Sequence, residues 1–165
     1  MKYPIGIQDF EQIIEGDYVY LDKTALVYDL VTNGKIYFLC RPRRFGKSLL
    51  VSTLKCYFDG KKELFKGLAI DKLEKDWKQY PVFHLSFGGQ NFVEPYALDK
   101  VLEEFVAMAE RIYGREELAE TLGSRFKAVL GNAHKKTGMR AVVLIDEYDK
   151  PLLDVMDMDI SVQNE

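Results

Sequence analysis

The residues with the clearest chemical potential are Gly46-Lys47-Ser48. Holding a triphosphate requires converging backbone N–H groups, a helix N-terminus with its partial positive charge, and a flexible ammonium group. Gly46 lets the backbone approach the phosphates because it has no Cβ, Lys47 can reach the β- and γ-phosphates, and the Ser48 hydroxyl can ligate Mg²⁺. These three residues therefore predict the second half of a phosphate-binding P-loop.

The first half of the loop departs from the usual pattern. The common sequence is G-x-x-x-x-G-K-[ST], and Arg41 stands where the first glycine is expected. We expect the rest of the loop and the first helical turn to contact the nucleotide. The predicted binding residues are Arg43, Arg44, Phe45, Gly46, Lys47, Ser48 and Leu49.

Three arginines crowd this loop, and their guanidinium groups repel one another unless an anion or carboxylates neutralise them. They can supplement Lys47 on the phosphates, or pair with acidic residues such as Asp149 and hold the loop in shape. Contact with nucleic acid is a third, weaker alternative, because the cluster is short and Phe45 is its only stacking aromatic residue.

A second chemical group, Asp146-Glu147, follows an apolar run at residues 141–145. Open parallel sheets bind ligands beyond the carboxyl ends of their strands, so Asp146 can hold Mg²⁺ together with Ser48. Glu147 can orient or deprotonate an attacking water, which makes Glu147 and Lys47 the predicted catalytic residues. Alone, such an acidic pair is more often an exposed strand end. Its joint occurrence with the loop predicts Walker A and Walker B motifs.

These groups need a strand before the loop and a helix after it. Residues 35–40 form a short apolar run typical of a strand buried on both faces, and helical spacing of apolar residues runs from Gly46 to Phe58. Further buried strands are expected at residues 81–87 and 141–145, and helices at residues 98–112 and 124–136. The alternation predicts an α/β fold, a P-loop NTPase with a parallel sheet flanked by helices.

Residues 1–34 form a helical lead-in to this core. Asp9 is expected to open a first helix that closes at Gly16, and Asp22 to cap a second that ends near Gly34. Residues 35–165 form the P-loop ATPase core. Because no repeat, low-complexity tract or linker marks a boundary, we treat residues 1–165 as a single domain.

Composition narrows the class of protein. The chain has 165 residues, of which 47% are hydrophobic and 13% aromatic, enough apolar surface to argue against disorder. A net charge of -3 gives no general attraction to nucleic acid or anionic membranes. No signal peptide and no run of roughly 18 apolar residues is present, so we expect a cytoplasmic protein without a membrane partner. The Asn-Lys-x-Asp segment of guanine sites is missing, which favours ATP.

In its loop and in the strand that ends on Asp-Glu, the sequence resembles the bacterial AAA-ATPase-like family, whose P-loop reads Arg-Pro-Arg-Arg-Phe-Gly-Lys-Ser. The resemblance extends from about Pro4 to Leu153 and makes Arg41 a family feature. The matching blocks, in order, are Pro4-Ile5-Gly6-Ile7 with Asp9-Phe10, Tyr20-Leu21-Asp22-Lys23-Thr24, Tyr57-Phe58 with Gly60, Phe65 with Gly67-Leu68, and Asp146-Glu147-Tyr148-Asp149-Lys150-Pro151.

The resemblance also implies what a complete ATPase would add. Members of the family usually continue into the rest of the ATPase core and a nuclease-like domain of the PD-(D/E)XK type. In ATPases of this class, the strand after Walker B lies between the P-loop strand and the Walker B strand. We therefore expect a core that is incomplete at the C-terminus, with a C-terminal nuclease-like domain or a partner protein as its companion.

The expected function is that of an ATP-binding, Mg²⁺-dependent P-loop ATPase module whose nucleotide state drives a conformational change. It would be an ATP hydrolase. Whether residues 1–165 hydrolyse ATP without the rest of a complete ATPase is a separate question that the sequence does not answer. The alternative is a non-catalytic interaction protein, or a nucleic-acid-associated one, that keeps the loop as a structural anion site.

Overall fold

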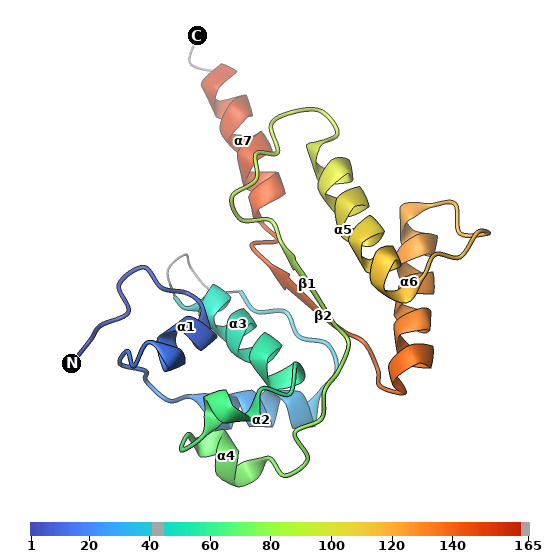
Figure 1. The fold of residues 1–165 in the computed structure, drawn as a ribbon. Coiled ribbons are helices and arrows are strands. Elements are labelled where there is room, and N and C mark those ends of the chain that lie inside the picture. Colours follow the sequence, from blue (N-terminus) through green and yellow to red (C-terminus); the bar gives the residue numbers. More distant parts are fainter. Residues whose placement is uncertain (41–44, 163–165) are drawn as a thin grey trace. The chain divides into compact units, whose positions relative to one another are not determined.

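The computed structural model of the chain describes residues 1–40 and 45–162 (Figure 1). It divides into two compact units, Met1–Val82 and Phe83–Glu165. The predicted P-loop falls in the first unit and the predicted Walker B residues fall in the second. That the whole chain acts as one domain stays a prediction.

The first unit is helical. Its first helix, α1, begins after Asp9, whose Oδ1 accepts the N–H of Gln12 at 2.9 Å, and ends before Gly16, as the sequence predicts. The helices of this unit are α1 (Phe10–Glu15), α2 (Thr24–Asn33), α3 (Lys47–Phe58), the 3-10 helix η1 (Lys62–Phe65) and α4 (Ala69–Leu73). The predicted helix after Gly46 is thus confirmed.

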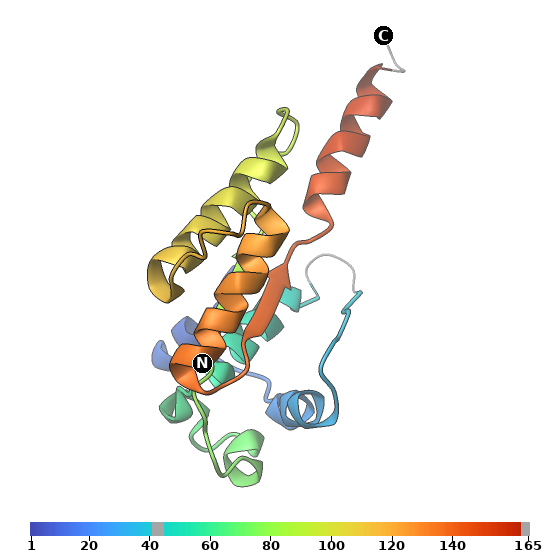
Figure 2. The same cartoon turned by 90° about the vertical axis from the view of Figure 1, so that its right-hand side faces the viewer.

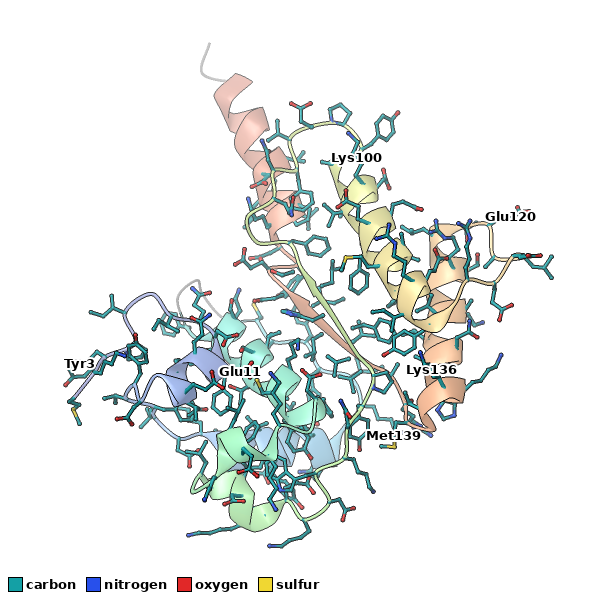
Figure 3. The ribbon with its side chains drawn as sticks, in the orientation of Figure 1. Tyr3, Glu11, Lys100, Glu120, Lys136 and Met139 are labelled. Atoms are coloured by element: carbon teal, nitrogen blue, oxygen red, sulfur yellow. The ribbon has the colours of Figure 1, made fainter. Side chains whose placement is uncertain are left out.

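Helix α1 packs on α3 through a fully buried aromatic residue. Phe10 and Phe65 are both 0% exposed, and their ring centroids lie 4.9 Å apart. The N–H of Phe10 donates to Ser52 Oγ at 2.9 Å, and this hydroxyl donates to Asp9 Oδ2 at 3.2 Å. Glu11, which is labelled in Figure 3, forms an ion pair of 2.6 Å with Lys61. Helix α1, which precedes the predicted P-loop in the chain, therefore packs on α3, which follows the loop.

Asp22 connects α2 to α4. The predicted N-cap position of α2 is one residue off, since Lys23 occupies it, but Asp22 Oδ1 still accepts the N–H and the hydroxyl of Thr24 at 2.8 and 2.7 Å. Asp22 Oδ2 accepts the N–H of Ala69 at 2.7 Å, and the Thr24 hydroxyl oxygen accepts the N–H of Ile70 at 3.1 Å. Two side chains thus satisfy N–H groups at the start of α4, which otherwise lack acceptors.

The strand predicted at residues 35–40 is not formed. Residues 36–40 have no regular secondary structure, and the side chains of Ile36 and Phe38 are 93% and 75% exposed. A strand buried on both faces requires neighbouring strands that accept and donate its backbone hydrogen bonds. No strand is present among residues 1–40 and 45–81. The apolar run therefore has the composition of a strand without the pairing that makes one.

The second unit contains the sheet. The N–H of Phe87 donates to the carbonyl of Asp146 at 3.1 Å, so the two strands end side by side and run parallel. Both predicted strands and both predicted helices of this unit are confirmed, and α7 is an addition. The elements are β1 (Val82–Ser86), α5 (Ala97–Tyr113), α6 (Leu122–Thr137), β2 (Val142–Asp146) and α7 (Lys150–Val162).

Helices α5 and α6 lie against each other on one side of this sheet (Figure 2). Phe83 of β1 packs there with Ala109 of α5 and Val129 of α6. On the other face, Val143 and Ile145 of β2 are 39% and 48% exposed. The prediction of a buried strand is therefore wrong for β2, because the described helices of this unit cover only one of its faces.

A buried ion pair joins α5 to α6. Arg125 Nη2 lies 2.7 Å from Glu110 Oε2, and Nε donates to Glu110 Oε1 at 2.9 Å, with both side chains 8% exposed. The Arg125 guanidinium holds the pKa of the Glu110 carboxyl below its usual range. Arg125 also contacts Glu103 of α5. Within the described residues, no helix is both long and apolar enough to span a membrane.

Replacing Phe10 should weaken the first unit strongly. Phe10→Ala removes a fully buried ring and leaves a cavity, so we expect a loss of about 3–5 kcal/mol in the free energy of unfolding. Urea denaturation followed by the fluorescence of Trp77, the single tryptophan of the chain, reports on this unit. The control is Ile5→Ala, since Ile5 is 91% exposed and its loss should cost less than about 0.5 kcal/mol. Equal urea midpoints for Phe10→Ala and Ile5→Ala would contradict the buried packing of Phe10.

Asp22 should make the stability of the first unit depend on acid pH. Partial burial raises the pKa of Asp22, but hydrogen bonds from Thr24 and Ala69 outweigh this and leave the pKa below its ordinary value. Its stabilising contribution is then complete above the unfolded pKa, about 4, and is lost as the pH falls through the lower folded pKa. Asp22→Asn should thus be less stable than the wild type at pH 7, with a gap that narrows below about pH 4. A gap in the urea midpoint that stays constant with pH would count against this.

Candidate functional site

The start of α3 has the local geometry of a phosphate site. Gly46 is the N-cap and lies in the left-handed region, with φ +73° and ψ +24°, a conformation that glycine adopts without strain. The first helical hydrogen bond runs from the Leu50 N–H to the Gly46 carbonyl at 3.0 Å. Among residues 1–40 and 45–162, no side chain caps this end of the helix. The N–H groups of Lys47 and Ser48 therefore point out of the helix, where an anion can accept them.

The predicted binding residues are only partly described. Gly46, Lys47, Ser48 and Leu49 come together in the first turn of α3, while Phe45 precedes them with a side chain that is 63% exposed. Arg43 and Arg44, like Arg41, lie outside the described residues. Their predicted roles on the phosphates or in shaping the loop stay predictions.

Asp146 is the last residue of β2, and it is 8% exposed. Its Oδ1 accepts the N–H of Glu147 at 2.9 Å. Within the part of the chain that is described, Oδ2 takes part in no hydrogen bond. A largely buried aspartate with one unengaged carboxylate oxygen fits a hard cation such as Mg²⁺.

No group of three or more His, Cys, Asp or Glu side chains gathers in metal-binding geometry anywhere in residues 1–40 and 45–162. This finding leaves the magnesium prediction untested, because a P-loop site takes only one carboxylate and one hydroxyl from the protein.

Glu147 follows β2 in a strained conformation. Its φ of +52° lies in the left-handed region, which costs a residue with a Cβ about 1–2 kcal/mol. The Glu147 carbonyl accepts the N–H of Lys150 at 3.0 Å, where α7 begins. The sequence gives no sign of this strain, since glutamate is not a residue expected at positive φ. Strained residues of this kind cluster at functional sites.

The Glu147 carboxylate lies beside Gly88. A Cβ on Gly88 would lie 3.0 Å from Glu147 Oε2 and 3.1 Å from both Cδ and Oε1. The only signal in the sequence is the Gly88-Gly89 pair, which begins two residues after the end of β1. The end of β2 therefore carries two carboxylates: Asp146, which accepts the Glu147 N–H, and Glu147, whose carboxylate lies beside Gly88.

The two halves of the predicted site belong to different units. Lys47 and Ser48 lie in Met1–Val82, and Asp146 and Glu147 lie in Phe83–Glu165. Each half has its own defined local structure. That the four residues form one site stays a prediction.

Comparison with known proteins gives the family. A family model described as "Predicted AAA-ATPase" matches residues 4–165. The chain belongs to the AAA-ATPase-like family. The resemblance read from the loop and from the Asp-Glu strand is thereby confirmed, and membership places the chain in a family described as ATPases.

A curated relative shows how much of a longer protein the chain represents. It is described as "Uncharacterized protein in vnfD 5'region", from Azotobacter chroococcum mcd 1, and is 43% identical over 155 residues. The match covers 93% of this chain but 30% of the relative, so the chain spans less than a third of that protein's length. No solved structure matches the chain.

The strain at Glu147 yields a stability test. Glu147→Gly and Glu147→Ala both remove the carboxylate, but only alanine keeps the cost of a Cβ at φ +52°. We expect the glycine variant to be more stable than the alanine variant by about 1 kcal/mol. Hydrogen exchange of the β2 amides measures this within the second unit. An alanine variant as stable as the glycine variant would argue against the left-handed conformation.

Proposed function

We propose that the chain is an ATP-binding, Mg²⁺-dependent P-loop ATPase module in which nucleotide state drives a conformational change in an attached domain or partner. The observation that carries the proposal is the uncapped start of α3, with left-handed Gly46 followed by Lys47 and Ser48. Membership of a family described as ATPases supports the choice of ATP.

Binding would use the first turn of α3. The N–H groups of Lys47, Ser48 and Leu49 would donate to phosphate oxygens, and the Lys47 ammonium would add a full positive charge to the partial charge of the helix terminus. The Ser48 hydroxyl and the Asp146 carboxylate would hold Mg²⁺, which neutralises phosphate charge when it is bound.

Hydrolysis would depend on Glu147. Its carboxylate would accept a proton from the attacking water as the water oxygen bonds to the γ-phosphorus and the bond to ADP breaks. Asp146 would act as a cation ligand, so the two neighbouring carboxylates would have different tasks. The Glu147 carboxylate lies beside Gly88, in a different place from the Asp146 oxygen that accepts the Glu147 N–H, which supports this division.

The P-loop NTPase fold is the architecture that we propose for the complete protein. The exposed side chain of Ile36 supports it, because apolar residues of a strand-like run are normally buried within a sheet. The exposed side chains of Val143 and Ile145 on β2 support it in the same way. A nuclease-like domain in the rest of a longer protein would be one recipient of the conformational change.

Removing the Lys47 ammonium should weaken ATP binding. We expect Lys47→Ala to lower the affinity for ATP at least about tenfold, equivalent to roughly 1.4 kcal/mol, as measured by calorimetry with and without Mg²⁺. Lys55→Ala is the matched control, since Lys55 lies in the same helix and pairs with Asp59 at 2.6 Å. Equal affinity for ATP in Lys47→Ala and the wild type would contradict the proposal.

Turnover is tested separately with Glu147→Gln, which should bind ATP like the wild type and release no phosphate. Phosphate release by the wild type above this variant would assign hydrolysis to these residues. Binding without such release would leave the chain as a binding module.

A further inference from the structure

Gly88 occupies a place that the sheet determines. It follows Phe87, whose N–H donates to the Asp146 carbonyl at 3.1 Å, so the register of β1 and β2 brings residue 88 next to Glu147. The Phe87 side chain is 7% exposed and packs edge-on to Phe92, with ring centroids 5.6 Å apart. The Gly88 N–H also donates to Ser86 Oγ at 3.2 Å. Backbone pairing, packing and a side-chain hydrogen bond therefore all fix this residue.

The space beside Gly88 is filled by a carboxylate. Contacts of 3.0–3.1 Å between a Cβ and the three atoms of the Glu147 carboxyl group are tighter than nine in ten Cβ contacts in proteins, so one of the two groups must give by a few tenths of an ångström. Glu147 would move, because its carboxylate is the end of a flexible side chain, whereas residue 88 is held by the backbone. Gly88 does not have a positive φ, so alanine there would not strain its own backbone.

We propose that Gly88 is a positioning residue for Glu147: its missing side chain leaves the room in which the Glu147 carboxylate lies. The proposal rests on the proposed function for its catalytic consequence, since Glu147 is the group that would accept the proton from water. A methyl group at residue 88 would displace this carboxylate.

The first test is independent of activity. The ¹³Cδ resonance of Glu147, identified by its loss in Glu147→Gln, should move in Gly88→Ala. It should stay in place in Gly131→Ala, the matched control, because a Cβ on Gly131 of α6 meets no atom within 4 Å. An unmoved Glu147 resonance in folded Gly88→Ala would overturn the proposal, whether or not the chain hydrolyses ATP.

The second test concerns catalysis. Gly88→Ala should lower kcat for ATP about 10- to 100-fold while KM and ATP affinity change less than about twofold. In a Glu147→Asp background, where the shorter side chain withdraws from the new methyl group, the same substitution should change kcat by less than about twofold. An equal loss of kcat in both backgrounds would show that Gly88 acts elsewhere. Absence of hydrolysis in the wild type would instead count against the proposed turnover. The role of Gly88 would then be tested by the ¹³Cδ resonance of Glu147 alone.

Should Gly88→Ala fail to fold, the Gly88→Ala/Glu147→Ala double variant decides. It lacks the carboxylate that the methyl group would meet, so it should recover the circular dichroism and melting temperature of Glu147→Ala. If the double variant also fails to fold, the contact between the residue 88 methyl group and the Glu147 carboxylate is not the cause of the misfolding, and the proposal is overturned.

Discussion

The hydrogen-bonded pairing of β1 with β2 is the constraint on which the second unit depends. It aligns the carboxyl ends of two strands that are separated by two long helices in the chain, and the bond between Phe87 and Asp146 marks the point of alignment. Everything of chemical interest in this unit follows within one residue of that bond. Asp146 becomes a nearly buried carboxylate, and Glu147 turns back over Gly88. A slip of one residue would place each side chain on the opposite face of the sheet.

The first unit shows the reverse case, a strand sequence without a pairing partner. The run at residues 35–40 has the composition of β1 and β2, yet it forms no strand. Composition is a property of the segment, whereas strand formation is a property of the pair, because backbone groups must be satisfied by a neighbour. The side chain of Ile36 is accordingly exposed, because this run forms no strand within the described residues.

This difference also explains what the sequence could predict. Helix α3, its start at Gly46 and the strand that ends on Asp146 are encoded locally, by spacing, glycine and β-branched residues, and they were predicted correctly. The buried pair of Arg125 with Glu110 and the contact of Gly88 with Glu147 join residues far apart in sequence. They depend on how helices and strands pack, and no local pattern marks them. The left-handed conformation of Glu147 was missed for a related reason: the surrounding fold imposes it against the preference of the residue.

The contact of Phe10 with Phe65 has a consequence for synthesis on the ribosome. Helix α1 leaves the ribosome before its partners, but it has only six residues and cannot persist alone in water. Ser52 and Phe65 follow Phe10 by 42 and 55 residues (52 − 10 and 65 − 10). The nascent chain therefore exposes Phe10 throughout that interval, together with the apolar run at residues 35–40. Both segments are candidates for capture by chaperones that bind short apolar stretches, until α3 and η1 arrive to cover the aromatic ring.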